Sequence, residues 1–254
     1  LGALTLADYE VDEYEVIGGM LGEPLRLTPS KTWGEDFLVP ADADVVIEAS
    51  IRPGDREIEA PFGEFPGYYG PQRLRPVVDV HAITRREDAI FQHAFVGHED
   101  NWNLGAVPKE GGIYRDVARR VPGVEQVHLP LSGCGRFRCY VSLEQTAEGE
   151  ANHAGLQALA SSDFVKQVVV VDEDVDAFDE REVLWAVATR VRADRDVQVV
   201  ENVKGNTLDP SVEGEVATAK VVVDATVPHG EQYPPRLDVP EGAVERMDPE
   251  AYLE

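Results

Sequence analysis

Hydrophobic and polar positions follow two different patterns along the chain. Up to about residue 100 the period is that of strands, clearest at residues 45–51, 76–84 and 89–96, which are bounded by Gly, Pro and Asp clusters. Helical spacing in this part is confined to residues 10–21. Glycines and a proline at residues 105–112 then predict a linker, followed by a helix at residues 114–120.

After Pro122 strands and helices alternate. Strands are expected at residues 124–129, 137–143, 168–171, 197–201 and 221–223, and helices at residues 151–161 and 180–189. Such alternation is typical of an α/β layer domain. We therefore divide the chain into residues 1–120 and an α/β domain, residues 121–254, whose acidic tail has a short amphipathic stretch at residues 244–253.

Composition indicates a globular protein with a strongly acidic surface. Of 254 residues 43% are hydrophobic, enough for one large core or two modest ones. The 48 acidic residues outnumber the 23 basic ones and give a formal net charge of −25. Such a surface repels nucleic acids and anionic membranes, which bind clustered cations. Because there is no long apolar segment and no N-terminal signal, we expect a soluble, cytoplasmic protein.

Two motifs that suggest metal chemistry are better explained structurally. Cys134 and Cys139 lack the spacing of a zinc or redox site, so they are expected to be reduced thiols. The acidic run at residues 172–176 begins like a calcium loop but lacks the glycine and the final glutamate of that motif. We expect it to be a turn in which Asp176 or Asp179 caps the following helix.

The most informative segment is EAPFGEFPGYY at residues 59–69, which sets Glu59 and Glu64 five positions apart. In a strand these two side chains point to opposite faces, and in a helix they lie about 140° apart. Pro61 and Gly63 interrupt both periodicities and let the chain aim both carboxyls into one cavity. The aromatic residues around them would exclude water and raise a carboxyl pKa. Spacing alone still favours a surface turn with two solvated glutamates.

This segment resembles the signature of the UbiD-type decarboxylases, which use prenylated FMN. The resemblance extends, in the family's order, over residues 12–24, 39–48, 82–90, 166–176, 183–190 and 223–226. It implies a mixed fold of class α+β or α/β. Residues 1–120 would be the C-terminal part of a split β-barrel flavin-binding domain. Residues 121–254 would be an α/β oligomerisation domain whose tail helix exchanges with a partner subunit in a homodimer or higher oligomer.

The resemblance also implies roles for individual acids. Glu64 matches the general acid/base, and Glu59 matches an ionised carboxylate paired with an arginine outside this chain. Glu13 matches the ligand of a divalent metal, Mn²⁺ or Mg²⁺, beside the cofactor phosphate, and K⁺ is a further expected ion. Glu15, two positions on, is the alternative match.

Cofactor and substrate contacts follow in the same way. Lys166 matches a lysine that reaches the flavin phosphate. Phe65, Thr207 and Leu208 match positions that line the substrate pocket. The implied substrate is an unsaturated or aromatic carboxylic acid, and the reaction is decarboxylation or its reverse.

Members of the family begin with an N-terminal region that carries most flavin-phosphate contacts and the other metal ligands, and this sequence starts at Leu1 without it. We therefore expect the second half of an enzyme, either a cleaved or truncated chain or one subunit of a split enzyme. The alternative is a non-catalytic assembly or scaffold subunit that completes the site of a partner chain.

The acidic surface, with only five lysines, also suits a salt-rich cytoplasm, where screening reduces self-repulsion. We predict that the melting temperature rises between low and molar KCl, as measured by circular dichroism. An unchanged or falling melting temperature would contradict a halophilic source.

Overall fold

The computed structural model describes residues 12–212, 216–237 and 242–243. The N-terminal part consists of helix α2 (Glu13–Leu21) and strands β1 (Leu27–Ser30), β2 (Gly34–Pro40), β3 (Val45–Glu59) and β4 (Arg73–Arg85). Asp12 caps α2 by accepting the Tyr14 N–H, and Gly22 ends it with φ 74°. The predicted helix is therefore confirmed over its described residues.

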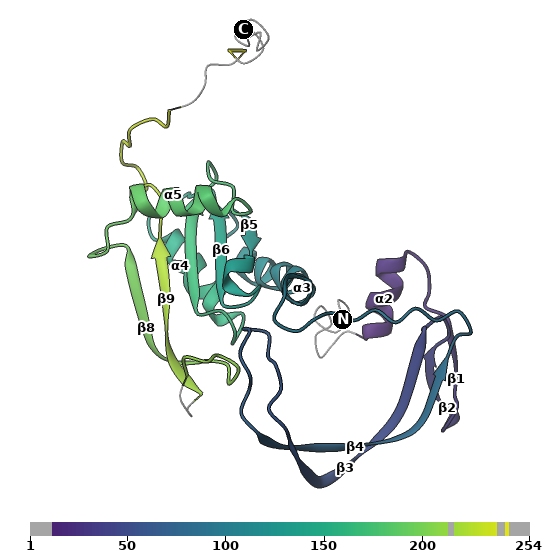
Figure 1. Ribbon diagram of the computed structural model, residues 1–254. Helices are drawn as coiled ribbons and strands as arrows, with labels where there is room; N and C mark the ends of the chain where they lie inside the picture. The colour runs from purple at the N-terminus through teal and green to yellow at the C-terminus, as the bar shows by residue number, and fades with distance from the viewer. Residues whose placement is uncertain (1–11, 213–215, 238–241, 244–254) are drawn as a thin grey trace, which may run out of the picture.

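The strands of this part form two separate antiparallel ribbons. β1 pairs with β2, and the long strands β3 and β4 pair with each other in an arch that swings away from the rest of the molecule (Figure 1). The buried Glu48 carboxylate on β3 ties the ribbons together, since it accepts the N–H groups of Lys31 and Thr32 at 2.7 and 2.6 Å. Among the described residues the ribbons do not close into a barrel.

The β3–β4 ribbon exposes apolar side chains along its length. Ile47, Ile58, Leu74 and Ile83 are each more than 60% exposed, and Val78 and Val80 are also open to solvent. A two-stranded ribbon has no second layer of its own to cover such a face. Contiguous exposed apolar surface of this kind is typical of an interaction site.

The C-terminal part is a five-stranded sheet with helices on both faces. Its elements are α3 (Glu99–Ala118), β5 (Val124–His128), the 3₁₀ turn η1 (Leu131–Gly133), β6 (Arg138–Leu143), α4 (Glu150–Ala160), β7 (Gln167–Asp172), α5 (Glu180–Arg190), β8 (Val197–Lys204) and β9 (Ala217–Asp224). The strand order is β5-β6-β7-β9-β8, with β6, β7 and β9 parallel and the two edge strands antiparallel.

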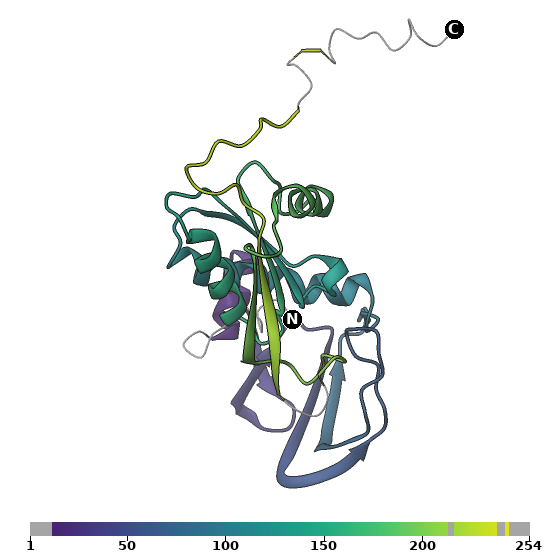
Figure 2. The same cartoon turned by 90° about the vertical axis from the view of Figure 1, so that its left-hand side faces the viewer.

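The core of this domain comes from alternating valines on the central strands. Val168 and Val170 of β7 pack in the cluster that includes residues of α3 and α4, whereas Val169 and Val171 pack with α5 on the other face. Figure 2, turned by 90°, shows the helices on either side of the sheet. Each fully buried valine contributes on the order of 1.5–3 kcal/mol. The fold is therefore mixed α/β, which confirms the predicted class.

Two predictions about elements are wrong. Residues 89–96 form no strand: Ile90 and Phe91 are exposed, and no described strand accepts their backbone hydrogen bonds, so alternation alone does not produce a ladder. The expected linker at residues 105–112 lies inside α3. Gly105 and Pro108 are buried there, and tertiary packing outweighs their poor helix propensity. β1 and β2 were not expected from the sequence.

Two further structural expectations, the cap of α5 and the free cysteines, are confirmed. Asp179 caps α5 by accepting the Arg181 N–H, and the carboxylates of Asp172 and Asp174 bind Arg190. Both cysteines are free thiols. No helix in the described part of the chain is long and apolar enough to cross a membrane. The amphipathic stretch at residues 244–253 lies outside the described residues.

Candidate active site

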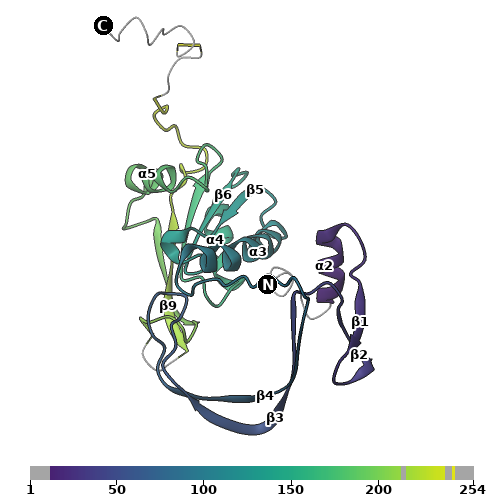
Figure 3. The same cartoon turned by 45° about the vertical axis from the view of Figure 1, so that its right-hand side comes forward.

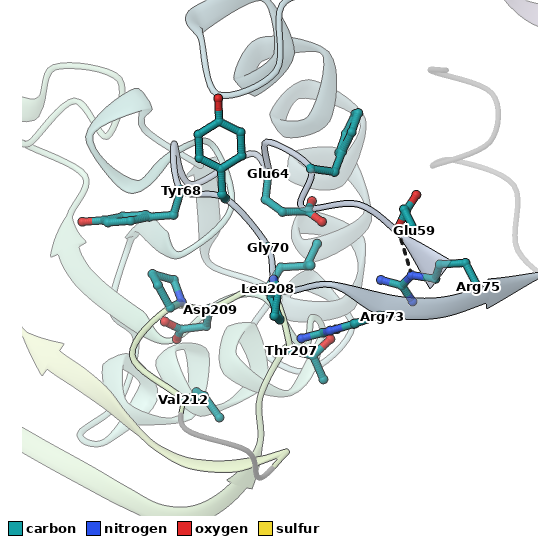
Figure 4. A pocket seen from close by; sticks show the side chains of 14 residues that line it. Glu59, Glu64, Tyr68, Gly70, Arg73, Arg75, Thr207, Leu208, Asp209 and Val212 are labelled. Atoms are coloured by element: carbon teal, nitrogen blue, oxygen red, sulfur yellow. Dashed lines mark hydrogen bonds and ion pairs between the residues drawn. The ribbon is translucent and has the colours of Figure 1, made fainter. Parts of the chain in front are cut away.

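Glu59 and Glu64 line one cavity of about 440 Å³. One wall is the segment from the end of β3 to the start of β4, and the other is the loop between β8 and β9 that carries Thr207 and Leu208 (Figure 4). The complete lining is Glu59, Phe62, Glu64, Tyr68, Tyr69, Gly70, Pro71, Arg73, Arg75, Thr207, Leu208, Asp209, Pro210 and Val212. Four of the residues predicted for the site, two acids and two from the loop, are thus brought together.

Glu64 is held by a tight turn that closes on itself. Its N–H donates to the Tyr68 carbonyl and the Gly70 N–H to the Phe62 carbonyl, both at 2.8 Å. The Gly67 N–H donates to the Glu64 carbonyl at 2.9 Å, with φ 83° at Gly67. A Cβ on Gly70 would lie 3.2 Å from Cγ and Oε1 of Glu64. Gly70 therefore leaves the space in which the Glu64 side chain lies.

Phe65 fixes this turn to the C-terminal domain. Its ring is 4% exposed and packs against Phe137 and Phe164, with ring centroids 5.0 and 5.6 Å away. The Trp102 indole N–H donates to the Phe65 carbonyl at 2.7 Å, and the Arg136 guanidinium lies 4.3 Å from the ring centroid. Phe65 was expected in the substrate pocket. It lies beneath the turn and is not among the residues that line the cavity.

Glu59 pairs with an arginine of this chain. Arg75 Nε lies 3.3 Å from Glu59 Oε2, and both side chains are about half exposed. An exposed pair of this kind contributes about 0–1 kcal/mol, so it orients Glu59 more than it stabilises the fold. Arg73 faces Glu59 across the β3–β4 ladder and lines the cavity, with no acidic side chain within 4.0 Å in the described residues. It is available to an anionic ligand.

Lys166 supports the opposite wall of the cavity. Its ammonium donates to both oxygens of Asp209 at 3.0 and 2.8 Å and to Ser211 Oγ at 3.0 Å. Burial alone would raise the pKa of Asp209, but the hydrogen bonds from Lys166 and Ser211 outweigh it and hold this pKa below its ordinary value. Lys166 is thus bound to the loop that carries Thr207 and Leu208. Contact with a flavin phosphate stays a prediction.

The aromatic residues of the turn do not cover the acids. Phe62, Tyr68 and Tyr69 are 56%, 64% and 82% exposed. The expectation that these three rings exclude water from the two glutamates is therefore wrong for the described residues. A second cavity of about 480 Å³ lies between the turn and residues 93–98, and Glu64 lines both cavities. The turn that carries Glu64 therefore lies between these two cavities.

Glu13 is exposed in the first turn of α2 and lines neither cavity. Figures 1 and 3 place α2 at the opposite end of the β3–β4 arch from the turn. Glu15 is exposed on the same helix. Within residues 12–212 and the other described segments no three His, Cys, Asp or Glu side chains are grouped as metal ligands. The described residues therefore do not form a metal site on their own.

Two family models match the chain. The Rift-related domain of 3-octaprenyl-4-hydroxybenzoate carboxy-lyase matches residues 1–99, and the C-terminal domain of the same carboxy-lyase matches residues 103–225. The chain therefore belongs to the UbiD family of carboxy-lyases, which confirms the resemblance seen in the sequence.

Individual relatives are decarboxylases. The chain is 35% identical to anhydromevalonate phosphate decarboxylase of Methanothermobacter thermautotrophicus, over 90% of this chain and 53% of that protein. It is 33% identical to phenolic acid decarboxylase of Bacillus subtilis, over 87% and 47%. The UbiD-class enzyme HmfF from Pelotomaculum thermopropionicum in complex with FMN has a TM-score of 0.88 at 40% identity, over 99% of this chain and 57% of that one. The chain thus spans about half the length of the curated relatives it matches.

Sequence reasoning missed Arg73, Arg75 and Asp209. The two arginines reach the acids only through the pairing of β3 with β4, in which Arg73 lies opposite Glu59. Asp209 reaches Lys166 across 43 residues of sequence. The sequence did offer one signal for the arginines. Arg73 and Arg75 lie two positions apart at the start of a strand, and the preceding strand is rich in acidic residues.

We predict that Asp209→Asn destabilises the fold by about 1–3 kcal/mol at pH 7, because it leaves the Lys166 ammonium without its carboxylate. The folded pKa of Asp209 is lowered, so its contribution is present above the unfolded pKa of about 4 and is lost as pH falls through the folded pKa. In urea unfolding, the difference between the wild type and the variant should shrink from pH 6 to pH 3.

The matched control is Asp163→Asn. Asp163 pairs with Lys204 at 2.6 Å, but both side chains are exposed, so its loss should change stability by less than about 1 kcal/mol. Equal effects of the two substitutions, or a difference that does not vary with pH, would contradict the account of Asp209.

Proposed function

We propose that this chain carries the acid/base half of the active site of a prenylated-FMN-dependent decarboxylase of an unsaturated or aromatic carboxylic acid. The observation that carries this proposal is the convergence of Glu59, Glu64 and Arg73 on one cavity. The decarboxylase names of its relatives, and an HmfF structure with prFMN at a TM-score of 0.84, support it.

Glu64 is the residue that moves the proton. The hydrogen bonds of the turn fix its backbone, and Gly70 leaves room for its carboxyl at the cavity. A carboxyl in this position can donate a proton to the carbon from which CO₂ departs, and the resulting carboxylate takes up a new proton from water before the next turnover. Glu59, paired with Arg75, orients the network. Arg73, which has no acidic partner among the described residues, offers a counter-ion to an incoming carboxylate.

The cavity fits the ring of a flavin better than its phosphate. Phe62, Tyr68 and Leu208 give it apolar walls, and its volume of about 440 Å³ lies within the range of small-molecule sites. Lys166, the cation expected at the phosphate, is already bound to Asp209. When bound, the prenylated flavin supplies the electron sink for decarboxylation. The contacts to the flavin phosphate would then come chiefly from residues other than Lys166. Glu13 and a metal ion, K⁺ included, have no role in the proposed reaction step.

The exposed ribbon indicates where the rest of the site joins. Its apolar side chains, and the open aromatic residues of the turn, need a covering body to exclude water from Glu64. We propose that an N-terminal region or a partner subunit packs on the β3–β4 ribbon and closes the cavity. Among the similar structures are an evolved dimeric form of HmfF and the vanillic acid decarboxylase of Sedimentibacter hydroxybenzoicus, whose structure includes a truncated second component.

The alternative is a scaffold subunit that completes the site of another chain. The solvent exposure of Tyr69 and the absence of a metal-ligand cluster in the described residues favour it. A scaffold, however, does not require a Gly70 that accommodates the Glu64 carboxyl.

In the complete, cofactor-loaded enzyme, Glu64→Gln should lower kcat by at least about 10²-fold, because the amide cannot transfer the proton. The absorption spectrum of the bound cofactor and the melting temperature should stay unchanged. Glu57→Gln, at an exposed position of β3, is the control and should retain full activity. Decarboxylation by the Glu64→Gln variant at a rate near that of the wild type would refute this role, and a wild type that holds no flavin would favour the scaffold.

A further inference from the structure

Two partly buried cations, Lys109 and Arg136, lie side by side behind the Glu64 turn. Both contact the same ring: Lys109 Nζ is 5.6 Å and Arg136 Cζ 5.7 Å from the centroid of Phe164. Neither side chain has a hydrogen bond or an acidic side chain within 4.0 Å in the part of the chain that the structure describes. In a chain of net charge −25, two such cations without an acid partner require an explanation.

Their position links them to the proposed active site. Trp102, Gly105 and Lys109 lie within two turns along α3, and Trp102 donates to the Phe65 carbonyl. A Cβ on Gly105 would lie 2.4 Å from Arg136 Nη2, so the glycine makes room for the guanidinium. Arg136 in turn lies on the ring of Phe65, the residue after Glu64. Arg136 is therefore separated from the proposed acid/base by Phe65, and Lys109 reaches Phe65 through the ring of Phe164.

Among the described residues, the surroundings of Lys109 and Arg136 disfavour the positive charge that each carries. Burial lowers the pKa of Lys109, and the charge of Arg136 lowers it further. Burial also lowers the pKa of Arg136. An anion placed between the two cations would relieve both the desolvation and the repulsion. On the same helix, Asn101 has a buried side-chain oxygen without a hydrogen-bond partner among the described residues, a further polar group that lacks its complement.

Stacking does not account for both residues. Arg136 lies over Phe65 and gains a cation–π contact of about 0.5–2 kcal/mol. Lys109, whose recorded cation–π contact is with the more distant ring of Phe164, gains less. An exposed position would solvate its ammonium better. Its partial burial next to a second cation is typical of a site for an anionic group.

We infer that Lys109 and Arg136 bind a second anionic group of the substrate, a carboxylate or a phosphate, distinct from the carboxylate that leaves. This inference rests on the proposed function, because it places the substrate beside Glu64. The stacked guanidinium can present its edge to two oxygens, and the ammonium adds a mobile point charge. The substrates would then be dianionic unsaturated or aromatic acids.

Binding to the complete, cofactor-loaded enzyme tests this without turnover. We would measure by calorimetry the Kd of three probes that share one ring: benzoate, terephthalate and 4-carboxyphenyl phosphate. At least one dianion should bind tenfold or more tightly than benzoate, and the one that does identifies the second group. Lys109→Met and Arg136→Met should each remove this gain and leave benzoate unaffected. Lys109→Arg, which keeps the charge, should retain it.

Arg120→Met is the matched control, since Arg120 is exposed just after α3, and it should change none of the three Kd values. Dianions that bind no better than benzoate, or variants that weaken all three probes equally, would overturn the inference. A wild type that decarboxylates no acid but keeps the preference for a dianion would refute the proposed function and leave the anion site standing.

Discussion

The insertion of Phe65 between Phe137 and Phe164 holds the two parts of the site in one place. Glu64 belongs to the segment between two strands of an open ribbon, which has no core of its own. The five-stranded domain has a packed core on both faces of its sheet. By burying one ring in that domain, the turn acquires the rigidity that a catalytic carboxyl needs.

The charged residues around Phe65 fall into two groups, one on the cavity side of the turn and one behind it. On the cavity side, Glu59 and Asp209 are each matched by a cation of the same chain, and Arg73 is left for a ligand. Behind the turn, Lys109 and Arg136 have no acid partner among the described residues. The chain carries acids in excess almost everywhere else. Under the proposed function, the few cations near Glu64 without acid partners among the described residues are the groups that contact an anionic substrate.

Much of this could be predicted from local sequence. Pro61 and Gly63 interrupt a regular strand or helix and allow the two glutamates to line one cavity, as they do. Spacing alone, however, favoured a solvated surface turn, and the expectation of a shared cavity depended on the resemblance to the UbiD family. The valine-rich strands and the capped helix α5 followed from periodicity and end signals. The helix through Gly105 and Pro108 could not be predicted in this way, because it depends on packing against a distant part of the chain. The same holds for Arg73 opposite Glu59, which depends on strand register, and for residues 89–96, whose alternation finds no partner strand.

Amide hydrogen exchange in Phe65→Ala tests most directly whether the anchor fixes the turn. Loss of a buried phenyl ring costs about 3–5 kcal/mol. The amides of Glu64, Gly67 and Gly70 should therefore exchange at least tenfold faster, while those of β6 and β7 keep their protection. Phe62→Ala, which removes an exposed ring of the same turn, should leave all of them unchanged. Unaltered exchange at the turn in Phe65→Ala would contradict the central role of this ring.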